Sequence, residues 1–373
     1  MCISIFLVLF LALLFSTEAA SAPKTDQFDL VRLSDKVYPN ARCLDGSPGS
    51  FYFRPGRPGA ETKWLLFFQG GGWCWTPKDC AHRAQSSLGS SVRHQSQRSG
   101  SSFAHVGMLN PLANSSALSN FNMVVMNYCD GGSFAGSASM EHESSVLHFR
   151  GRDIRQAIVN LLMRSYGMNT ATEVVVGGQS AGALAALMGL DAIAEQVRAT
   201  SKDCSVVGLL DSGLFMDQSS AHHNVYDSVQ RVVHPLDDDG HLDYAAGLRR
   251  TAKMMHMFEG SNTACVRNSP RDKPCFFVQH LAPYVVAPFF MLQSQYDSWS
   301  LTNIYGGNDR LGVNMFGYNS TIAIRRIVTD KTDRQRSAVR GAFLHSCLSH
   351  TVGVPAWNND FKDHTGRTPA DAF

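Results

Sequence analysis

The feature that most constrains the fold is a repeated alternation of short apolar runs with longer segments of helical periodicity. Apolar runs rich in Val, Phe, Leu and Met, most of them ending in or near Gly or Asp, cover residues 63–69, 120–128, 172–178, 204–213 and 287–297. Runs of this length without polar alternation are typical of strands buried on both faces. Strands that alternate with helices predict an α/β fold with a mostly parallel sheet covered by helices.

Three segments carry the helical patterns. Residues 149–166 place Ile154 and Ile158 on one face, as an amphipathic helix does. Residues 180–199 are rich in Ala and Leu, and residues 322–343 favour a late helix. His345 would then lie at the end of this last helix.

Residues 218–285 break the alternation, and we expect them to be an insertion that caps the carboxyl edge of the sheet. The insertion contains a histidine-rich part, residues 222–241. Residues 237–240 read DDDG, which suggests a calcium loop, but the glycine comes too early for an EF-hand. A solvated acidic loop is the preferred interpretation.

The chain begins with an uncharged apolar run, residues 3–15, followed by small residues that include an A-x-A pattern at 20–22. This arrangement is typical of a secretory signal peptide. The run is shorter than the ~20 residues of a spanning helix, although a signal anchor remains the alternative. We expect residues 1–22 to be the signal peptide, 23–373 to form one α/β domain without a stable membrane span, and the protein to be extracellular, for example in a cell wall.

The cysteines support an oxidising environment. Of the nine cysteines, Cys2 falls in the expected signal peptide, which leaves eight. An even number in a secreted chain predicts disulfides, here four. Two pairs are close in sequence and are candidate disulfides: Cys74 with Cys80, and Cys265 with Cys275. The sequence leaves the other pairings open.

Composition excludes several partner classes. Charged residues make up 17% of the chain, the net charge is +2, and Lys and Arg are scattered. This balance does not indicate binding to nucleic acid or to an anionic membrane. The sequons at Asn114 and Asn319 are candidate glycosylation sites, consistent with secretion. Nothing in the sequence demands more than a monomer.

A G-x-S-x-G pattern, residues 178–182, carries the first chemical signal. It follows the apolar run that ends at Val176 and precedes the Ala-rich helical segment, so it has the strand–turn–helix context of a nucleophile elbow. Ser180 would then stand exposed at a helix N-terminus, where unpaired amides favour negative charge. The alternative is a structural serine in a glycine-rich turn.

A serine nucleophile needs a base, and the base needs an orienting acid. In this fold class the chain order is Ser, then acid, then His. Acids that close predicted strands after Ser180 are Asp211 and Asp297. We prefer Asp297 because it closes the later strand, and Asp211 would then cap a loop or order the site.

Three histidines follow the preferred acid: His345, His350 and His364. His350 lies in a loop beyond the predicted helix, where Cys347 could tether it by a disulfide, so it is the predicted base. His345 fits the helix surface or core, and His364 lies in a polar tail and fits solvent.

Acyl transfer also needs preorganised donors for the oxyanion. In this fold class one donor is the amide after the nucleophile, here that of Ala181, and the others come from a Gly-rich loop after an early strand. Residues 69–75, QGGGWCW, hold that position. Cys74 has no metal-spaced partners, which argues against zinc. One Trp of this loop is expected to anchor it and the other to line the cleft.

These residues resemble the pectin acetylesterase family, which includes the Notum carboxylesterases. The resemblance covers about residues 43–353. It rests on these segments in order: CLDGSPGSFY (43–52), GGGWC (70–74), LGSS (88–91), YCDGGSF (128–134), GGQSAG (177–182), DSGLFMD (211–217), YDSW (296–299) and SCLSH (346–350). The segments YCDGGSF and YDSW are similar to the pectin acetylesterase branch.

The resemblance implies a secreted, disulfide-bonded α/β-hydrolase without metal or cofactor. It implies a triad of Ser180, Asp297 and His350. The implied oxyanion-hole residues are Gly71, Gly72, Trp73 and Ala181. Trp75 and residues 222–241 are not part of the family pattern, and the position of Cys204 leaves its disulfide partner in doubt.

The leading hypothesis is therefore a serine esterase that removes O-acetyl groups from a polysaccharide, one similar to pectin. A Notum-like deacylase of longer acyl esters, lipidated protein included, is the first alternative. A catalytically inactive binding protein on the same fold is the second.

Overall fold

The computed structural model describes residues 27–103, 106–109, 117–218, 243–307, 309–329, 339–352, 362–363 and 365–373. The expected signal peptide, the acidic stretch 237–240, Asn114 and His364 lie outside these ranges. The histidine-rich part of the expected insertion, residues 222–241, lies outside them as well.

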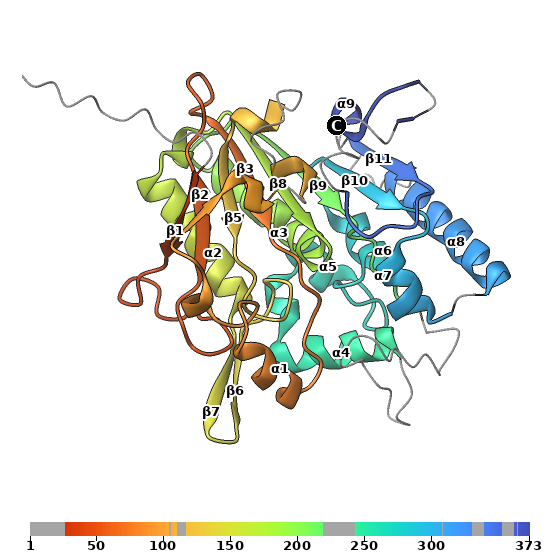
Figure 1. The fold of residues 1–373 in the computed structure, drawn as a ribbon, viewed down its shortest axis with the longest axis horizontal. Helices are drawn as coiled ribbons and strands as arrows, with labels where there is room; N and C mark the ends of the chain where they lie inside the picture. Colours follow the sequence, from red (N-terminus) through yellow and green to blue (C-terminus); the bar gives the residue numbers. More distant parts are fainter. Residues whose placement is uncertain are drawn as a thin grey trace, which may run out of the picture.

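A large, mostly parallel sheet forms the centre of the described molecule. Its nine strands are β1 (Gln27–Arg32), β2 (Ser50–Arg54), β3 (Lys63–Phe68), β4 (Gln97–Ser99), β5 (Asn122–Met126), β8 (Glu173–Gln179), β9 (Ser205–Asp211), β10 (Phe289–Ser294) and β11 (Arg340–His345). They lie in the order β11-β10-β9-β8-β3-β5-β2-β1-β4, and Figure 1 shows β1 and β2 at one side of the molecule and β10 and β11 at the other. The strands from β11 to β5 are parallel, and β2, β1 and β4 continue the sheet in antiparallel pairs.

Helices flank this sheet. They are α1 (Pro77–Ala84), α2 (Gly151–Ser165), α3 (Ala181–Arg198), α4 (Tyr244–Met255), α5 (Thr263–Asn268), α6 (Val278–Leu281), α7 (Ser298–Ser300), α8 (Arg310–Thr329) and α9 (Pro369–Ala372). A separate hairpin of β6 (Ala138–His142) and β7 (Ser145–Phe149) projects from the body in Figure 1. Among the described helices, none combines the length and apolarity that a bilayer crossing requires. The predicted α/β class is confirmed.

The sheet is buried on both faces, as its apolar runs predict. Along β3, Trp64, Leu66 and Phe68 join one core cluster, while Leu65 and Phe67 join the cluster on the opposite face. Because successive side chains of a strand point to opposite faces, an unbroken apolar run supplies two cores at once.

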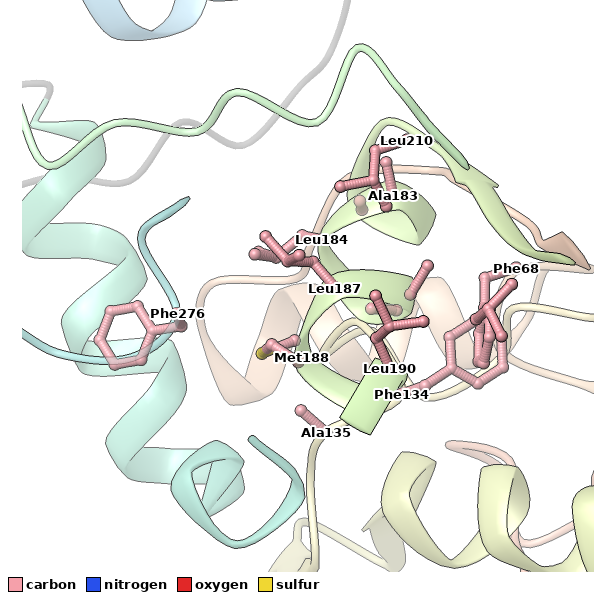
Figure 2. Packing of buried hydrophobic residues seen from close by; sticks show 14 of the residues in the cluster. Phe68, Phe134, Ala135, Ala183, Leu184, Leu187, Met188, Leu190, Leu210 and Phe276 are labelled. Atoms are coloured by element: carbon pink, nitrogen blue, oxygen red, sulfur yellow. The ribbon is translucent and has the colours of Figure 1, made fainter. Parts of the chain in front are cut away.

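Helix α3 lies inside the larger core cluster. It is apolar on nearly all sides, which is expected of a helix that is buried rather than amphipathic. Figure 2 shows Leu184 and Met188 on the side of α3 toward Phe276, and Leu190 toward Phe68 and Phe134. The helix that begins directly after Ser180 is therefore held rigidly against the sheet.

The five predicted strands are all present as β3, β5, β8, β9 and β10, with ends shifted by at most a few residues. The predicted helix over 322–343 is wrong in its second half. Helix α8 ends at Thr329, and residues from Arg340 form strand β11, which pairs in parallel with β10. His345 consequently ends a strand and not a helix.

Three disulfides form among the described residues, not the four expected from the cysteine count. Cys74–Cys80 and Cys265–Cys275 are confirmed, and Cys43 pairs with Cys129. Cys204 is buried and unpaired, and Cys347 is exposed and unpaired, so the expected tether of the loop after residue 345 is wrong.

Topology explains why the two remaining cysteines do not pair. Cys204 directly precedes β9, and Cys347 follows β11. Because β9, β10 and β11 are parallel, these cysteines lie at opposite edges of the sheet. A strand of 6 residues, such as β11, spans about 20 Å. This is far more than the ~7 Å limit between the Cα atoms of a disulfide.

Candidate active site

Ser180 stands at a sharp turn between β8 and α3. Its backbone has φ 55° and ψ −129°, in the positive-φ region that a non-glycine residue rarely adopts. Its N–H donates to the carbonyl of Asp211 at 2.8 Å, which ties the turn to the end of the neighbouring strand β9. A Cβ on Gly182 would lie 2.1 Å from the carbonyl oxygen of Phe68, so this close approach requires glycine. The turn has the geometry of a nucleophile elbow.

The structure brings the three predicted triad residues together. Ser180 Oγ lies 2.9 Å from His350 Nε2, and His350 Nδ1 lies 2.8 Å from Asp297 Oδ2. Asp297 is 2% exposed. Its second oxygen accepts a hydrogen bond from the N–H of Ser300 at 2.8 Å, as the N-cap of α7. The cap fixes the carboxylate so that one oxygen faces the imidazole.

Asp211 lies near the Ser180–His350–Asp297 hydrogen bonds, but within the described structure it makes no hydrogen bond to the imidazole ring of His350. Its Oδ2 accepts from the N–H of Val352 at 2.8 Å, and its Oδ1 accepts from the hydroxyl of Ser212 at 3.0 Å. The Ser212 hydroxyl in turn accepts from the N–H of Thr351 at 2.8 Å. Asp211 thus holds the main chain directly after His350, which matches the loop-ordering role considered for it.

Burial perturbs two titratable groups at this edge. Asp211 is 1% exposed, and desolvation raises the pKa of its carboxyl to about 6. His345 lies at the end of β11, where desolvation lowers the pKa of its ring to about 4. With this lowered pKa the His345 ring is neutral near pH 7. It is nevertheless not the base of Ser180, because the ring that lies against the Ser180 hydroxyl is that of His350.

The glycine-rich loop after β3 lies against the elbow. A Cβ on Gly70 would come within 3.1 Å of the Cβ of Ser180. Gly71 has φ 147° and Gly72 has φ 64°, conformations that favour glycine. Within the described part of the chain, the amides of Gly71, Gly72 and Trp73 donate no hydrogen bond.

The amide of Ala181 belongs to the first turn of α3, so it has no acceptor within the helix. The side chain of Ala181 itself is fully buried. All four residues predicted for the oxyanion hole therefore lie on the two segments that meet at Ser180.

Aromatic side chains fill the space beside His350. We call Trp73, Trp75, Phe215, Tyr244 and Trp299 the aromatic cluster. The ring of Trp73 lies 4.9 Å from that of Phe215 and 5.8 Å from that of Trp299, measured between centroids. Trp75 packs edge-on against Tyr244, and the Trp299 ring lies 6.1 Å from the imidazole of His350.

The sequence reasoning found Trp73 but left Trp75 unexplained and missed the other three cluster residues as a group. Trp73 and Trp75 are both almost fully buried, so both anchor the loop. Phe215 and Trp299 follow strands that end at the same sheet edge, which is the one signal that could have placed them near Ser180.

Other predicted residues lie away from this edge. Asn319 is exposed on α8, where a glycan would meet solvent. Among the described residues, no group of three His, Cys, Asp or Glu side chains is arranged to hold a metal ion. The described site itself brings together a serine, a histidine, a carboxylate and backbone amides.

The chain is similar to known proteins over most of its length. A family model described as Pectinacetylesterase matches residues 21–368. Pectin acetylesterase 7 of Arabidopsis thaliana is 26% identical over 353 residues, covering 90% of this chain and 83% of the relative. Pectin acetylesterase 5 of the same plant is 29% identical over 320 residues, covering 80% of this chain and 67% of the relative.

Human palmitoleoyl-protein carboxylesterase NOTUM is 26% identical over 330 residues, covering 86% of this chain and 61% of the human protein. The resemblance seen in the sequence segments is therefore confirmed over most of the chain. The chain belongs to the pectinacetylesterase family of carboxylic ester hydrolases.

Proposed function

We propose that the protein is an extracellular serine esterase that removes O-acetyl groups from a polysaccharide, with Ser180, His350 and Asp297 as its catalytic triad. The observation that carries this proposal is the continuous Ser180–His350–Asp297 hydrogen-bond chain, with distances of 2.9 and 2.8 Å, at a strained strand–helix turn. A serine in this arrangement gains a base and an oriented acid.

The reaction proceeds through an acyl-enzyme. His350 takes the proton of Ser180 while the serine oxygen attacks the ester carbonyl, and Asp297 stabilises the imidazolium that forms. The amides of Gly72, Trp73 and Ala181 bind the oxyanion of the tetrahedral intermediate. His350 then protonates the ester oxygen of the sugar, which leaves as a hydroxyl group. Water, deprotonated by the same histidine, releases acetate from Ser180.

The substrate class rests on two observations. The plant relatives bear the name pectin acetylesterase. The aromatic cluster also limits the acyl group, because the Trp299 ring lies 6.1 Å from the His350 ring and packs against Trp73 and Phe215. Side chains that touch one another leave little room for a long acyl chain unless they move, which favours acetyl.

We further propose an extracellular location and a cap over the active site. Three disulfides among the described residues are typical of an oxidising compartment. The described part of the expected cap, residues 243–285, supports its role. Tyr244 at the start of α4 belongs to the aromatic cluster, and the Thr251 hydroxyl lies 3.5 Å from the Cys74 carbonyl oxygen.

A second candidate function is the removal of a longer acyl group from a protein. It is favoured by the match to NOTUM, whose printed name is palmitoleoyl-protein carboxylesterase. Long-chain turnover requires the aromatic cluster to open, so the two functions differ in their dependence on acyl length.

The test is acetate release from acetylated pectin, xylan and chitin, measured side by side with purified protein and with Ser180→Ala. The proposal expects Ser180-dependent acetate from acetylated pectin. No acetate from any polymer, together with Ser180-dependent hydrolysis of octanoyl esters, would favour the long-chain function.

A further inference from the structure

The oxyanion loop contains two peptide units whose direction decides whether their N–H groups face the reaction. One joins Gly71 to Gly72 and the other joins Gly72 to Trp73. In a planar trans peptide the C=O and N–H bonds point in opposite directions. Any group that holds the carbonyl of Gly71 therefore fixes the N–H of Gly72, and a group that holds the carbonyl of Gly72 fixes the N–H of Trp73.

Arg83 on α1 holds the first of these carbonyls. Its Nη1 donates to the carbonyl oxygen of Gly71 at 2.9 Å, and its Nε donates to that of Leu88 at 3.2 Å. The guanidinium also stacks over the ring of Tyr128, 5.0 Å from the centroid. With contacts on three sides, Arg83 keeps one orientation.

Tyr128 holds the second carbonyl. Its hydroxyl donates to the carbonyl oxygen of Gly72 at 2.7 Å and accepts from the N–H of Ser133 at 2.9 Å. Its side chain is fully buried, and desolvation raises the pKa of the phenol far above its ordinary value. The hydroxyl is therefore protonated near neutral pH and can donate to the Gly72 carbonyl.

Ser133 connects Tyr128 to the side chain of Trp73. The indole Nε1 of Trp73 donates to Ser133 Oγ at 2.9 Å. Ser133 has φ 52°, a strained backbone held by the buried carboxylate of Asp130, which accepts from the N–H groups of Gly132 at 3.2 Å and Phe134 at 3.3 Å. The segment that carries Tyr128 is thus itself rigid.

These contacts matter because the loop would otherwise be free to rotate. Gly71 and Gly72 lack side chains, so a peptide flip at either costs little. The amides of Gly72 and Trp73 donate no hydrogen bond within the described structure, so no other contact of theirs sets their direction. Among the hydrogen bonds of these two peptide units in the described structure, those of the carbonyls set the direction of the N–H groups.

We propose that Tyr128 and Arg83 are positioning residues of the oxyanion hole, which act by holding the carbonyls of Gly72 and Gly71 so that the amides of Trp73 and Gly72 face the oxygen of the tetrahedral intermediate. This inference rests on the proposed esterase function, because an oxyanion forms only if Ser180 attacks an ester.

The first test compares Tyr128→Phe with Tyr52→Phe. Tyr52 is a matched control, because it is a buried tyrosine on β2 whose hydroxyl donates to a backbone carbonyl, that of Gln95, at 2.9 Å. With p-nitrophenyl acetate and active-site titration, Tyr128→Phe is expected to lower kcat/KM by about 10–100-fold, since a displaced donor loses part of its effect. Tyr52→Phe is expected to stay within about twofold of wild type, as its hydrogen bond does not touch the loop.

A second readout separates positioning from general damage. Methylboronic acid forms an anionic tetrahedral adduct with the serine that mimics the acetyl intermediate. If Tyr128 orients the oxyanion donors, the inhibition constant of methylboronic acid should rise by the same factor as kcat/KM falls, because both report on binding of the tetrahedral state.

Arg83 provides an independent variant, on a partly exposed helix, should Tyr128→Phe fail to fold. Arg83→Met should lower kcat/KM by about tenfold or more and weaken methylboronic acid in parallel. Arg83→Lys keeps a donor and should recover part of the loss.

Wild-type activity that persists in Ser180→Ala would reject the esterase mechanism itself. Ser180-dependent activity that is unchanged in both Tyr128→Phe and Arg83→Met would instead overturn only the positioning role. A lower kcat/KM with no change in methylboronic acid binding would overturn it as well.

Discussion

Asp297 and Asp211 are both buried carboxylates at the carboxyl edge of the sheet, yet their hydrogen bonds assign them different roles. Asp297 directs one oxygen to His350 Nδ1 at 2.8 Å and the other to the N–H of Ser300. Asp211 directs both oxygens to the segment around the histidine, through Val352 and Ser212. The geometry separates the acid that orients the ring from the acid that holds its backbone.

This difference gives the first prediction. Asp297→Asn should lower kcat by about 10³–10⁴-fold, because an amide opposite Nδ1 favours the wrong tautomer of the imidazole. Asp211→Asn should lower kcat by less than about 100-fold, because the Asp211 side chain acts only through the position of the loop that carries His350. Steady-state kinetics of the two purified variants checks the order, and a larger loss in Asp211→Asn would show that the acids have been assigned in reverse.

The second prediction concerns stability against pH. The pKa of Asp211 is raised to about 6 by burial, so between its unfolded pKa and this value the native state binds the proton more tightly than the unfolded state. Its contribution to stability is therefore present at low pH and is lost as pH rises through about 4 to 6.

Asp211→Asn removes this titration. The free energy of unfolding of the variant, relative to wild type, should increase by up to about 3 kcal/mol between pH 4 and pH 7. Urea denaturation at both pH values measures this change. A difference between variant and wild type that stays constant with pH would contradict the assignment.

At the scale of elements, helix α1 is tied to the oxyanion loop at two points. The disulfide Cys74–Cys80 links the loop to the helix covalently, and Arg83 binds the Gly71 carbonyl from the same helix. Thr76 caps the helix by accepting from the N–H of Asp79 at 3.1 Å. The loop and α1 therefore behave as one unit.

The third prediction follows from this link. The double variant Cys74→Ala/Cys80→Ala should lose about 2–3 kcal/mol of stability on the chain-entropy model of disulfides. It should also lose activity, because the loop can shift relative to Ser180. The Cys265–Cys275 disulfide closes a ring of similar size that does not include the oxyanion loop. The variant Cys265→Ala/Cys275→Ala is therefore the control, and we expect a similar loss of stability and a smaller loss of kcat/KM. Equal losses of activity in both would contradict a special role of α1.

The elements that could be predicted from the sequence are those whose signal is local. Residues 63–69 form an unbroken apolar run, and such a run is stable only where a strand is covered on both faces. Strand β11 gave no such signal: RGAFLH is half-exposed at the sheet edge, contains a glycine and alternates weakly. Its strand conformation is set by pairing with β10, which no local pattern reports.

The same distinction explains which site residues could be predicted. Ser180 follows from a strand–turn–helix pattern, and Asp297 and His350 follow from chain order in the fold class. Tyr128 contacts Gly72 across 56 positions of sequence, and this contact depends on how β5 and β3 pair. Tertiary contacts of this kind leave no trace in local composition.

At the scale of the whole molecule, segments far apart in sequence converge on one edge of the sheet. The aromatic cluster draws on the loop after β3, the segment after β9, the start of α4 and the start of α7. Its rings contact one another beside His350, so under the proposed function the acyl group meets side chains from four parts of the chain. Acyl-chain preference is therefore a property of the assembled molecule.

The fourth prediction tests this acyl-chain preference. Wild type should turn over acetyl esters with a kcat/KM at least about tenfold above octanoyl esters, since a hydrophobic pocket of fixed size discriminates by this order. Trp299→Ala opens space beside His350 and should lower the ratio of kcat/KM for acetyl esters to kcat/KM for octanoyl esters. Parallel kinetics with p-nitrophenyl acetate and octanoate gives both values, and a wild-type preference for octanoate would indicate the long-chain function.

Under the proposed function, Ser180 is the nucleophile of an esterase. The most direct measurement is the active-site-titrated rate of p-nitrophenyl acetate hydrolysis by wild type, Ser180→Ala and the exposed control Ser205→Ala. The triad predicts a loss of at least about 10³-fold in Ser180→Ala and none in Ser205→Ala. A Ser180→Ala protein that retains activity within tenfold of wild type would show that Ser180 is not the nucleophile.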